Sequence, residues 1–275
     1  MWRPPSDRYF NIDSAGKATE LGSTFTFDFG QSGLKLDSKS VSLAIVRGTF
    51  WWTIPNIQDS WIELKFPAEE GKLYPDLEVL IPIPTGLYTY NLLNERIYTA
   101  LKLFQLDYED FPAAAVRIQA DLSTQTLAFD CSVPVSIRLI SRATRQENAL
   151  AYVLGFPIND DTVYTVTEPG LISAPDYARF DSVQFLQVAS QDLCDTGIVQ
   201  NDGTSRGVMA QITINVPPGA QITYDPSNPL EIPTSVFSGS RPKLQARLTL
   251  LDHNGQTVNT NGQSWSVLLR VRSYD

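Results

Sequence analysis

The stretch Thr24-Phe25-Thr26-Phe27-Asp28-Phe29 alternates polar and aromatic residues. Successive side chains of a β-strand point to opposite faces, so this alternation predicts a strand with one buried face. The same period of two returns near the C-terminus in residues 244–251 (LQARLTLL) and 265–272 (WSVLLRVR), which we expect to pair as a long hairpin. The period of two therefore indicates the fold class, and we predict an all-β protein.

Further runs of β-type residues follow one another at short intervals between these segments. We expect strands at 41–54, 60–66, 77–83, 115–120, 126–129, 135–140, 163–167, 182–188, 208–216 and 220–225. Strands at such intervals, separated by turn signals, are typical of antiparallel sandwiches and barrels rather than of βαβ folds. Gly48 lies inside the first of these runs and indicates a bulge or a bend.

One segment changes to a helical period. Five apolar residues recur there at steps of three and four, and so share one helical face: Leu93, Ile97, Ala100, Leu101 and Phe104. We predict an amphipathic helix over about residues 89–104, with Thr89 or Asn91 accepting hydrogen bonds at its N-terminus. The apolar stripe is expected to be buried against the sheets.

A second, shorter helix is expected over about residues 148–154, where Asn148 begins the turn and Gly155 ends it. The sequence has no internal repeat, no Gly/Ser-rich linker and no charge run that would mark a domain boundary. We therefore expect an N-terminal arm, residues 1–16, followed by one domain with elaborated loops, residues 17–275.

Composition excludes several classes of protein. The chain has 275 residues, of which 43% are hydrophobic and 19% charged, so it can bury a core and is not a disordered chain. Its formal net charge of -9 opposes a phosphate-binding groove, and we expect no direct contact with nucleic acid. No uninterrupted apolar run is long enough for a membrane-spanning helix, so we expect no membrane insertion.

Catalytic and cofactor motifs are missing from the sequence. It contains no P-loop, no dinucleotide fingerprint and no Gly-X-Ser-X-Gly elbow. Its single histidine, His253, lies in a segment that is typical of a hairpin turn, and one histidine cannot build a multi-histidine metal site. Cys131 and Cys194 are expected to be reduced residues in or near the core. We predict no catalytic residue, no metal site and no cofactor.

Acidic residues gather in two segments that look like turns. One contains Asp107, Glu109 and Asp110, and the other contains Asp160 and Asp161. Acidic residues in turns are usually solvated, and that is the interpretation we favour. Calcium binding at one of these loops remains an alternative, because hard cations bind several oxygen ligands on a flexible loop. A glycosidase would need two such carboxylates facing each other across a cleft.

Aromatic residues form the candidate subunit interface. Trp51 and Trp52 are adjacent, so they point to opposite faces of a strand and one of them lies outside the core. The N-terminal arm adds Trp2, Tyr9 and Phe10, which would face water unless something covers them. We predict a ring-like homo-oligomer, with a pentamer favoured, in which the arm and one of the two tryptophans contact an adjacent chain. The alternative is that the arm packs on its own domain.

Several segments, taken in their order along the chain, form one pattern. A Pro/Gly turn and a tyrosine, in residues 83–88, lead into the amphipathic helix, and residues 150–156 end in Leu-Gly-Phe. The other segments lie in the C-terminal third: 222–226, Asn228-Pro229, 248–258 and 261–269. This order resembles the jelly-roll penton and minor capsid proteins of polinton-like viruses, virophages and related double-stranded DNA viruses. The resemblance covers about residues 80–275.

The resemblance implies an antiparallel jelly-roll β-sandwich and a structural, non-enzymatic subunit of a virion shell. It implies the major capsid protein of the same virion as a partner, and it leaves open whether the position is the vertex or another minor one. Two other functions stay open. One is a carbohydrate- or receptor-binding β-sandwich, in which Phe50-Trp51-Trp52 and Trp61 would stack a sugar. The other is a hydrolase on a jelly-roll scaffold.

Overall fold

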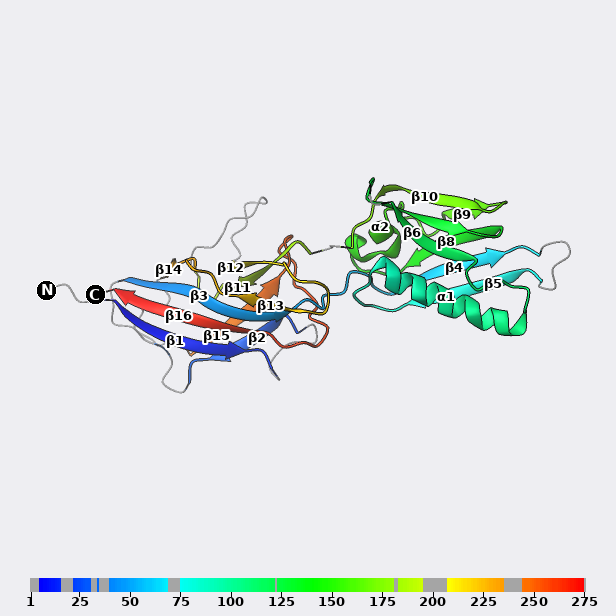
Figure 1. Ribbon diagram of the computed structural model, residues 1–275. Helices are drawn as coiled ribbons and strands as arrows, with labels where there is room; N and C mark the ends of the chain where they lie inside the picture. Colours follow the sequence, from blue (N-terminus) through cyan, green and yellow to red (C-terminus); the bar gives the residue numbers. More distant parts are fainter. Residues whose placement is uncertain are drawn as a thin grey trace. The chain divides into compact units, whose positions relative to one another are not determined.

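The chain folds into two compact units, each with its own core. The computed structural model describes residues 5–15, 22–30, 34, 40–68, 75–121, 123–180, 183–194, 207–234 and 244–274. The first unit combines Met1–Ile54 with Val183–Asp275, and the second, Pro55–Ser182, is inserted between them (Figure 1). The sequence predicted a single domain over residues 17–275, because no compositional change marks either end of the insert. Within the described ranges, no helix is both long and apolar enough to cross a membrane.

The first unit is a sandwich of two antiparallel sheets. Its strands, in chain order, are β1 (Ser6–Asp13), β2 (Thr24–Asp28), β3 (Ser40–Trp51), β11 (Phe185–Ala189), β12 (Val208–Thr213), β13 (Gln221–Tyr224), β14 (Ile232–Thr234), β15 (Gln245–Leu251) and β16 (Ser266–Tyr274). One sheet has the order β1-β16-β3-β13, and the other has the order β12-β11-β15-β2. The short β14 also pairs with β3, beyond the end of β13.

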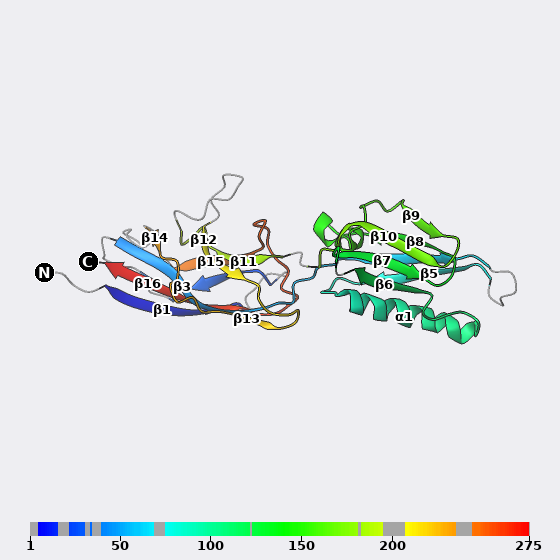
Figure 2. The same ribbon diagram turned by 45° about the horizontal axis from the view of Figure 1, so that its top comes forward.

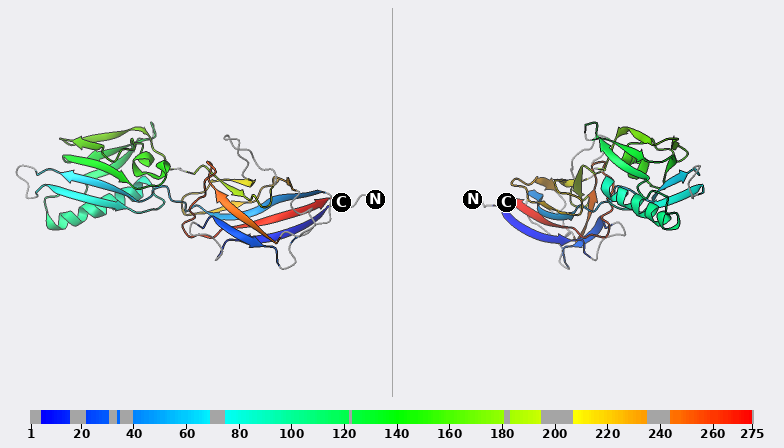
Figure 3. Two further views of the ribbon diagram at one scale, coloured as in Figure 1. Left: turned by 180° about the vertical axis from the view of Figure 1, so that it is seen from behind. Right: turned by 45° about the vertical axis from the view of Figure 1, so that its right-hand side comes forward.

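This strand order defines a jelly roll. If β13 and β14 count as one interrupted strand along β3, the described residues of the unit form eight strands, and the two sheets read 1-8-3-6 and 2-7-4-5. Two interlocked Greek keys give this order. The first and last strands are neighbours, and Figure 3 shows β16, in red, between β1 and the lighter blue β3. The predicted all-β jelly-roll class is confirmed.

The predicted C-terminal hairpin is wrong. β15 pairs with β11 and β2, whereas β16 pairs with β1 and β3 in the opposite sheet. The alternation correctly located both strands and their buried faces. It carries no information on the neighbour of each strand, and here the chain crosses from one sheet to the other between the two.

Most of the described part of the N-terminal arm is a strand of the first unit. β1 pairs antiparallel with β16 in an unbroken register from Ser6↔Ser273 to Asp13↔Ser266. The sequence shows no strand period here, because the inward-facing positions hold Arg8 as well as Phe10 and Ile12. Residues 6–13 of the arm therefore pack on their own unit.

The core of the first unit lies between its two sheets. The rings of Phe50 and Trp265 stack with centroids 5.8 Å apart, and Phe25 meets Trp265 edge-on at 5.0 Å. Gly48 leaves room for this packing, since a Cβ there would lie 2.6 Å from the Phe50 ring. The irregularity predicted at Gly48 lies two residues earlier: Gly48 pairs regularly with Val267, and the bulge is at Val46, which has no partner between the pairs Leu268↔Arg47 and Leu269↔Ile45.

The inserted unit is a second, smaller sandwich that carries both helices (Figure 2). Its strands are β4 (Ser60–Phe66), β5 (Leu77–Ile83), β6 (Val116–Asp121), β7 (Thr126–Cys131), β8 (Val135–Ser141), β9 (Val163–Val166) and β10 (Gly170–Tyr177). They form the sheets β5-β4-β8-β9 and β10-β7-β6. The helices are α1 (Tyr90–Asp107) and α2 (Leu150–Leu154), with a 3-10 turn at Gln146–Asn148.

Helix α1 is confirmed, and it covers a sheet edge. Its stripe of Leu93, Ile97 and Leu101 is fully buried, and the Thr89 hydroxyl accepts a hydrogen bond from Leu92 N. Asn94 binds the free edge of β6 like a neighbouring strand, because its Nδ2 donates to the Ile118 carbonyl at 2.8 Å and its Oδ1 accepts from Ile118 N at 2.6 Å. Covering an edge in this way blocks unwanted strand pairing.

The short helix α2 begins differently from the prediction. Asn148 belongs to the preceding 3-10 turn, and Ala149 is the N-cap without a side-chain hydrogen bond. The Asn148 amide instead donates to the Pro55 carbonyl at 2.9 Å, at the start of the inserted unit. Gly155 ends the helix as predicted, in the left-handed region with a φ of 84°.

Candidate functional site

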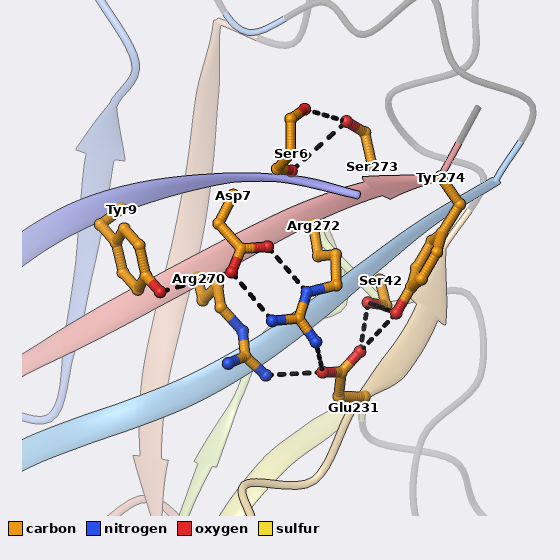
Figure 4. Close-up of polar contacts among 9 residues, drawn as sticks. All are labelled: Ser6, Asp7, Tyr9, Ser42, Glu231, Arg270, Arg272, Ser273 and Tyr274. Carbon is orange, nitrogen blue, oxygen red and sulfur yellow. Dashed lines mark hydrogen bonds and ion pairs between the residues drawn. The ribbon is translucent and has the colours of Figure 1, made fainter. Parts of the chain in front are cut away.

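The outer face of the sheet β1-β16-β3-β13 carries a cluster of interlocked polar side chains (Figure 4). Strand alternation turns Val267, Leu269 and Val271 of β16 into the core. The same alternation turns Leu268, Arg270, Arg272 and Tyr274 outward, next to side chains of β1 and β3. We call the group the Arg272 cluster: Asp7, Ser42, Glu231, Arg270, Arg272 and Tyr274.

Arg272 is the centre of the cluster. Its Nε and Nη2 donate to the two carboxylate oxygens of Asp7 at 2.7 and 2.9 Å, and its Nη1 donates to Glu231 at 2.8 Å. A forked guanidinium–carboxylate pair of this kind is stronger than a single hydrogen bond. Arg272 therefore joins the first strand, the last strand and the segment before β14.

Glu231 is the second centre of the cluster. Its Oε1 also accepts from Arg270 Nη2 at 2.6 Å, and its Oε2 accepts from the hydroxyls of Ser42 at 2.7 Å and Tyr274 at 2.9 Å. Every carboxylate oxygen in the cluster thus has at least one donor. The four charges sum to zero, because two guanidinium groups face two carboxylates.

The electrostatics of the cluster favour the ionised carboxylates. The Arg272 hydrogen bonds lower the pKa of Asp7 below its ordinary value. Burial alone would raise the pKa of Glu231, but the hydroxyls of Ser42 and Tyr274 and the two arginine charges outweigh it, so that pKa is also lowered. Hydrogen bonds to Asp7 raise the pKa of Arg272 further above its usual range. The arrangement holds strands together, and its groups are not poised for proton transfer at neutral pH.

The candidate interface residues divide between the two faces of this sheet. Tyr9 of β1 is 55% exposed and Trp51 of β3 is 37% exposed, and both lie on the outer face. Across the sheet, Tyr9 of β1 is level with Arg270 of β16 and with Ala44 of β3. Trp51 lies seven residues further along β3 than Ala44, so Tyr9 and Trp51 are roughly 20 Å apart along the strands. The Arg272 cluster and two exposed aromatics thus share one surface.

The other candidate interface residues point inward or lie outside the described residues. Trp52 is 5% exposed and belongs to the core of the first unit. Phe10 is half-buried and forms an edge-to-face cluster with Phe27 and Phe29 of the β2 segment, with centroids 6.2 and 5.4 Å away. Trp2 lies outside the described part of the chain.

Trp61, the other candidate for sugar stacking, lies on the outer face of the β5-β4-β8-β9 sheet in the inserted unit. The Arg142 guanidinium lies over its ring, 5.1 Å from the centroid. One ring face is therefore occupied by a cation–π contact. Trp51 and Trp61 belong to different units and do not form one aromatic platform within either of them.

His253 lies in a turn, as predicted. The turn closes through Gly255 N donating to the Asp252 carbonyl at 2.9 Å, and the Asp252 carboxylate accepts from Asn254 N. The His253 ring packs edge-on against Phe185. In the part of the chain that the structure describes, no hydrogen bond joins this ring to a serine or a cysteine.

The other titratable candidates are dispersed. Cys131 and Cys194 are buried thiols, and burial, helped by the charge of Asp130, raises the pKa of Cys131 to about 11. The 107–110 acids lie where α1 ends, and Asp160 accepts a hydrogen bond from Ser141 N in another loop. Among the described ranges, no three His, Cys, Asp or Glu side chains gather at a distance suited to a metal ion.

The Arg272 cluster was not predicted from the sequence. Arg270 and Arg272 alternate with apolar residues, which is the normal outer face of any half-exposed strand. The only signal available was the pairing register, which places Asp7 opposite Arg272 across nearly the whole chain. A register between such distant strands cannot be read from a single sequence.

Comparison with known proteins gives similarity at the level of structure only. No protein-family model matches the sequence, and no curated protein matches it. The crystal structure of the mavirus penton protein has 9% sequence identity and a TM-score of 0.45, covering 98% of this chain and 100% of the other. A chain of the cryo-EM structure of the Sputnik virophage has 15% identity and the same TM-score of 0.45, covering 98% of each chain. With TM-scores this low, the jelly-roll assignment rests on the strand order and not on these two structures.

Proposed function

We propose that the chain is a structural subunit of a viral capsid, as a penton or another minor capsid protein. The observation that carries the proposal is the 1-8-3-6 and 2-7-4-5 strand order of the first unit. Jelly rolls of this kind build viral capsids and lectins. The ordered sequence segments between residues 80 and 275, which resemble jelly-roll penton and minor capsid proteins, favour the capsid role over the lectin role.

The proposed subunit assembles as a homo-oligomer, with a pentamer favoured, and contacts the major capsid protein of the same virion. The outer face that carries Tyr9 and Trp51 is the proposed contact with the adjacent chain. Tyrosine, tryptophan and arginine are enriched at interface centres, whereas other charged and polar groups are typical of the rim. The proposed role needs no cofactor and no catalytic residue, and the dispersed positions of His253, the thiols and the acidic groups are compatible with it.

Native mass spectrometry of the full-length protein, over a range of concentrations, tests the proposal. A closed ring supports it, with five copies as the expected number. Tyr9→Ser should shift the assembly towards monomer, whereas Tyr98→Ser should not, because Tyr98 is similarly exposed at 47% but lies on α1 of the inserted unit. A protein that stays monomeric at high concentration and is absent from particles would overturn the capsid role. Specific glycan binding by such a monomer would replace it with a receptor-binding module.

A further inference from the structure

Strand β1 is weakly embedded in its own unit. It is an edge strand, and all of its strand pairing is with β16. Of its eight residues, only Ile12 is fully buried and Phe10 is half-buried, while the other six are exposed. Exposed edge strands with few buried side chains open at lower free energy than core strands.

Polar contacts fasten the N-terminal half of β1. Asp7 is bound by the forked hydrogen bonds of Arg272, and the hydroxyl of Ser6 lies 2.6 Å from that of Ser273. The Tyr9 hydroxyl donates a longer, 3.4 Å bond back to Asp7. Apart from its backbone pairing with β16 and the contact between two serine hydroxyls, this half of the strand is held by one ion pair, and that pair is sensitive to salt because it is partly exposed.

Removal of β1 would leave a site with a defined charge. The titratable groups facing Asp7 are Tyr9 on β1, Arg270, Arg272 and Tyr274 on β16, and Glu231 before β14. Without Asp7, two guanidinium groups would face a single carboxylate, so the vacated edge of β16 would be positive. A strand that carries a carboxylate at the position of Asp7 and apolar side chains at those of Phe10 and Ile12 fits this edge.

We propose that β1 is an exchangeable strand: it leaves its own β16 when the Arg272 cluster is weakened, and the β1 strand of a second copy binds the vacated edge. The second copy is the chosen partner because its residues 6–13 have the same charge, apolar positions and register. Exchange of an identical element is a low-cost route to assembly. The proposal deepens the proposed homo-oligomer by naming the element that would pass between subunits.

Disulfide trapping between two differently tagged chains tests the exchange. One chain carries Ser6→Cys and the other Ser273→Cys, at directly opposed positions of the β1/β16 register. The chains are mixed in a thiol oxidant, at low salt and at high salt. We expect a mixed disulfide that forms several-fold faster at high salt. Adding Asp7→Asn to the Ser6→Cys chain should give the same acceleration at low salt, without any change in pH.

The matched control uses two opposed serines that cannot exchange. Ser60 of β4 and Ser141 of β8 are paired, with their hydroxyls 3.0 Å apart, and both strands are interior strands of the inserted unit. A mixture of Ser60→Cys and Ser141→Cys chains should form no mixed disulfide. The double variant Ser6→Cys/Ser273→Cys should close within one chain, which verifies that the geometry permits the bond.

Two results would overturn the exchange. One is the absence of a mixed disulfide under all conditions while the double variant closes internally. The other is a mixed disulfide that forms equally fast in the control pair. Native mass spectrometry of the unmodified protein decides the oligomer separately. A closed ring without a mixed disulfide would remove strand exchange and leave the capsid role in place.

Discussion

Asn56, the second residue of the inserted unit, donates a hydrogen bond from its Nδ2 to the carbonyl of Phe180 at 3.1 Å. The same amide group binds both backbone groups of Tyr88, because Nδ2 donates to its carbonyl and Oδ1 accepts from its N–H, each at 2.8 Å. Asn56 is 1% exposed. One buried side chain thus ties the beginning of the insert to its end.

Replacement of Asn56 should destabilise the inserted unit. Asn56→Ala leaves the Tyr88 N–H and two carbonyls without their partner, and a buried unsatisfied group costs about 1–3 kcal/mol. We expect a loss of about 3 kcal/mol in the free energy of unfolding, measured by denaturant titration. Asn91→Ala, at an exposed position of α1, is the control and should cause no loss. Equal stability of the two variants would show that Asn56 does not hold the ends together.

The insert should fold by itself. It is one continuous segment, Pro55–Ser182, with a hydrophobic core of its own and ends joined by Asn56. A fragment of residues 55–182 should show a cooperative thermal transition and a far-ultraviolet circular dichroism spectrum with a helical contribution from α1. A fragment without a cooperative transition would mean that the core requires the first unit.

The two sides of α1 should respond differently to substitution. Leu93 is fully buried, so Leu93→Ala should cost about 2–5 kcal/mol through lost burial and a cavity. Leu103, on the same helix, is 62% exposed, and Leu103→Ala should change stability by less than about 0.5 kcal/mol. Thermal melting of the two variants makes the comparison. Similar losses would contradict the packing of the helix.

Acid should weaken the first unit through Asp7 and Glu231. Both carboxyl pKa values are lowered in the folded state, so each group contributes stability above its unfolded pKa of about 3.9–4.3, and that contribution is lost as the pH falls through the folded value. At neutral pH, Asp7→Asn should cost about 1 kcal/mol. The stability of the Asp7→Asn variant should also depend less on pH in the acid range than that of the unchanged protein.

The control for acid sensitivity is another carboxylate of the first unit. Asp225 pairs with Arg47 at 3.4 Å, but its side chain is 58% exposed. Asp225→Asn should therefore retain the full acid dependence, as measured by denaturant unfolding at several pH values. The same loss of acid dependence in both variants would show that the effect is general and does not come from the Arg272 cluster.

Local patterns were enough to predict elements whose two faces differ strongly. The expected strands 60–66 and 77–83 coincide with β4 and β5, and the expected helix begins within one residue of α1. In each case, apolar residues recur at the period of the element and bury one side completely. β1, β10 and β14 were missed, because β1 and β10 each have a single fully buried residue and β14 has only three residues, too few to show a period.

Long-range relationships could not be predicted in the same way. The sequence of β16 is equally compatible with pairing to β15 or to β1, since either neighbour leaves the same residues buried. Both ends of the insert lie in short segments of ordinary composition, so no feature of the sequence indicated a boundary between two units with separate cores. The Arg272 cluster depends on the register between Asp7 and Arg272, and it was invisible for that reason.

The neighbouring positions of the first and last strands determine when the protein can complete its fold during synthesis. Of the strands that the structure describes, β1 is translated first, but its pairing partner β16 is translated last. The insert is contiguous and can fold as soon as it has left the ribosome, whereas β1, β2 and β3 cannot pair until their later-translated partner strands are available. Once Asn56 has joined its ends, 128 residues act as a short connection between β3 and β11, which reduces the chain entropy lost when the jelly roll closes. Until β16 has been translated, the unpaired strands of the first unit are exposed to other nascent chains. We therefore expect aggregation to start from a ribosome-bound intermediate in which the insert is folded and the jelly roll is not.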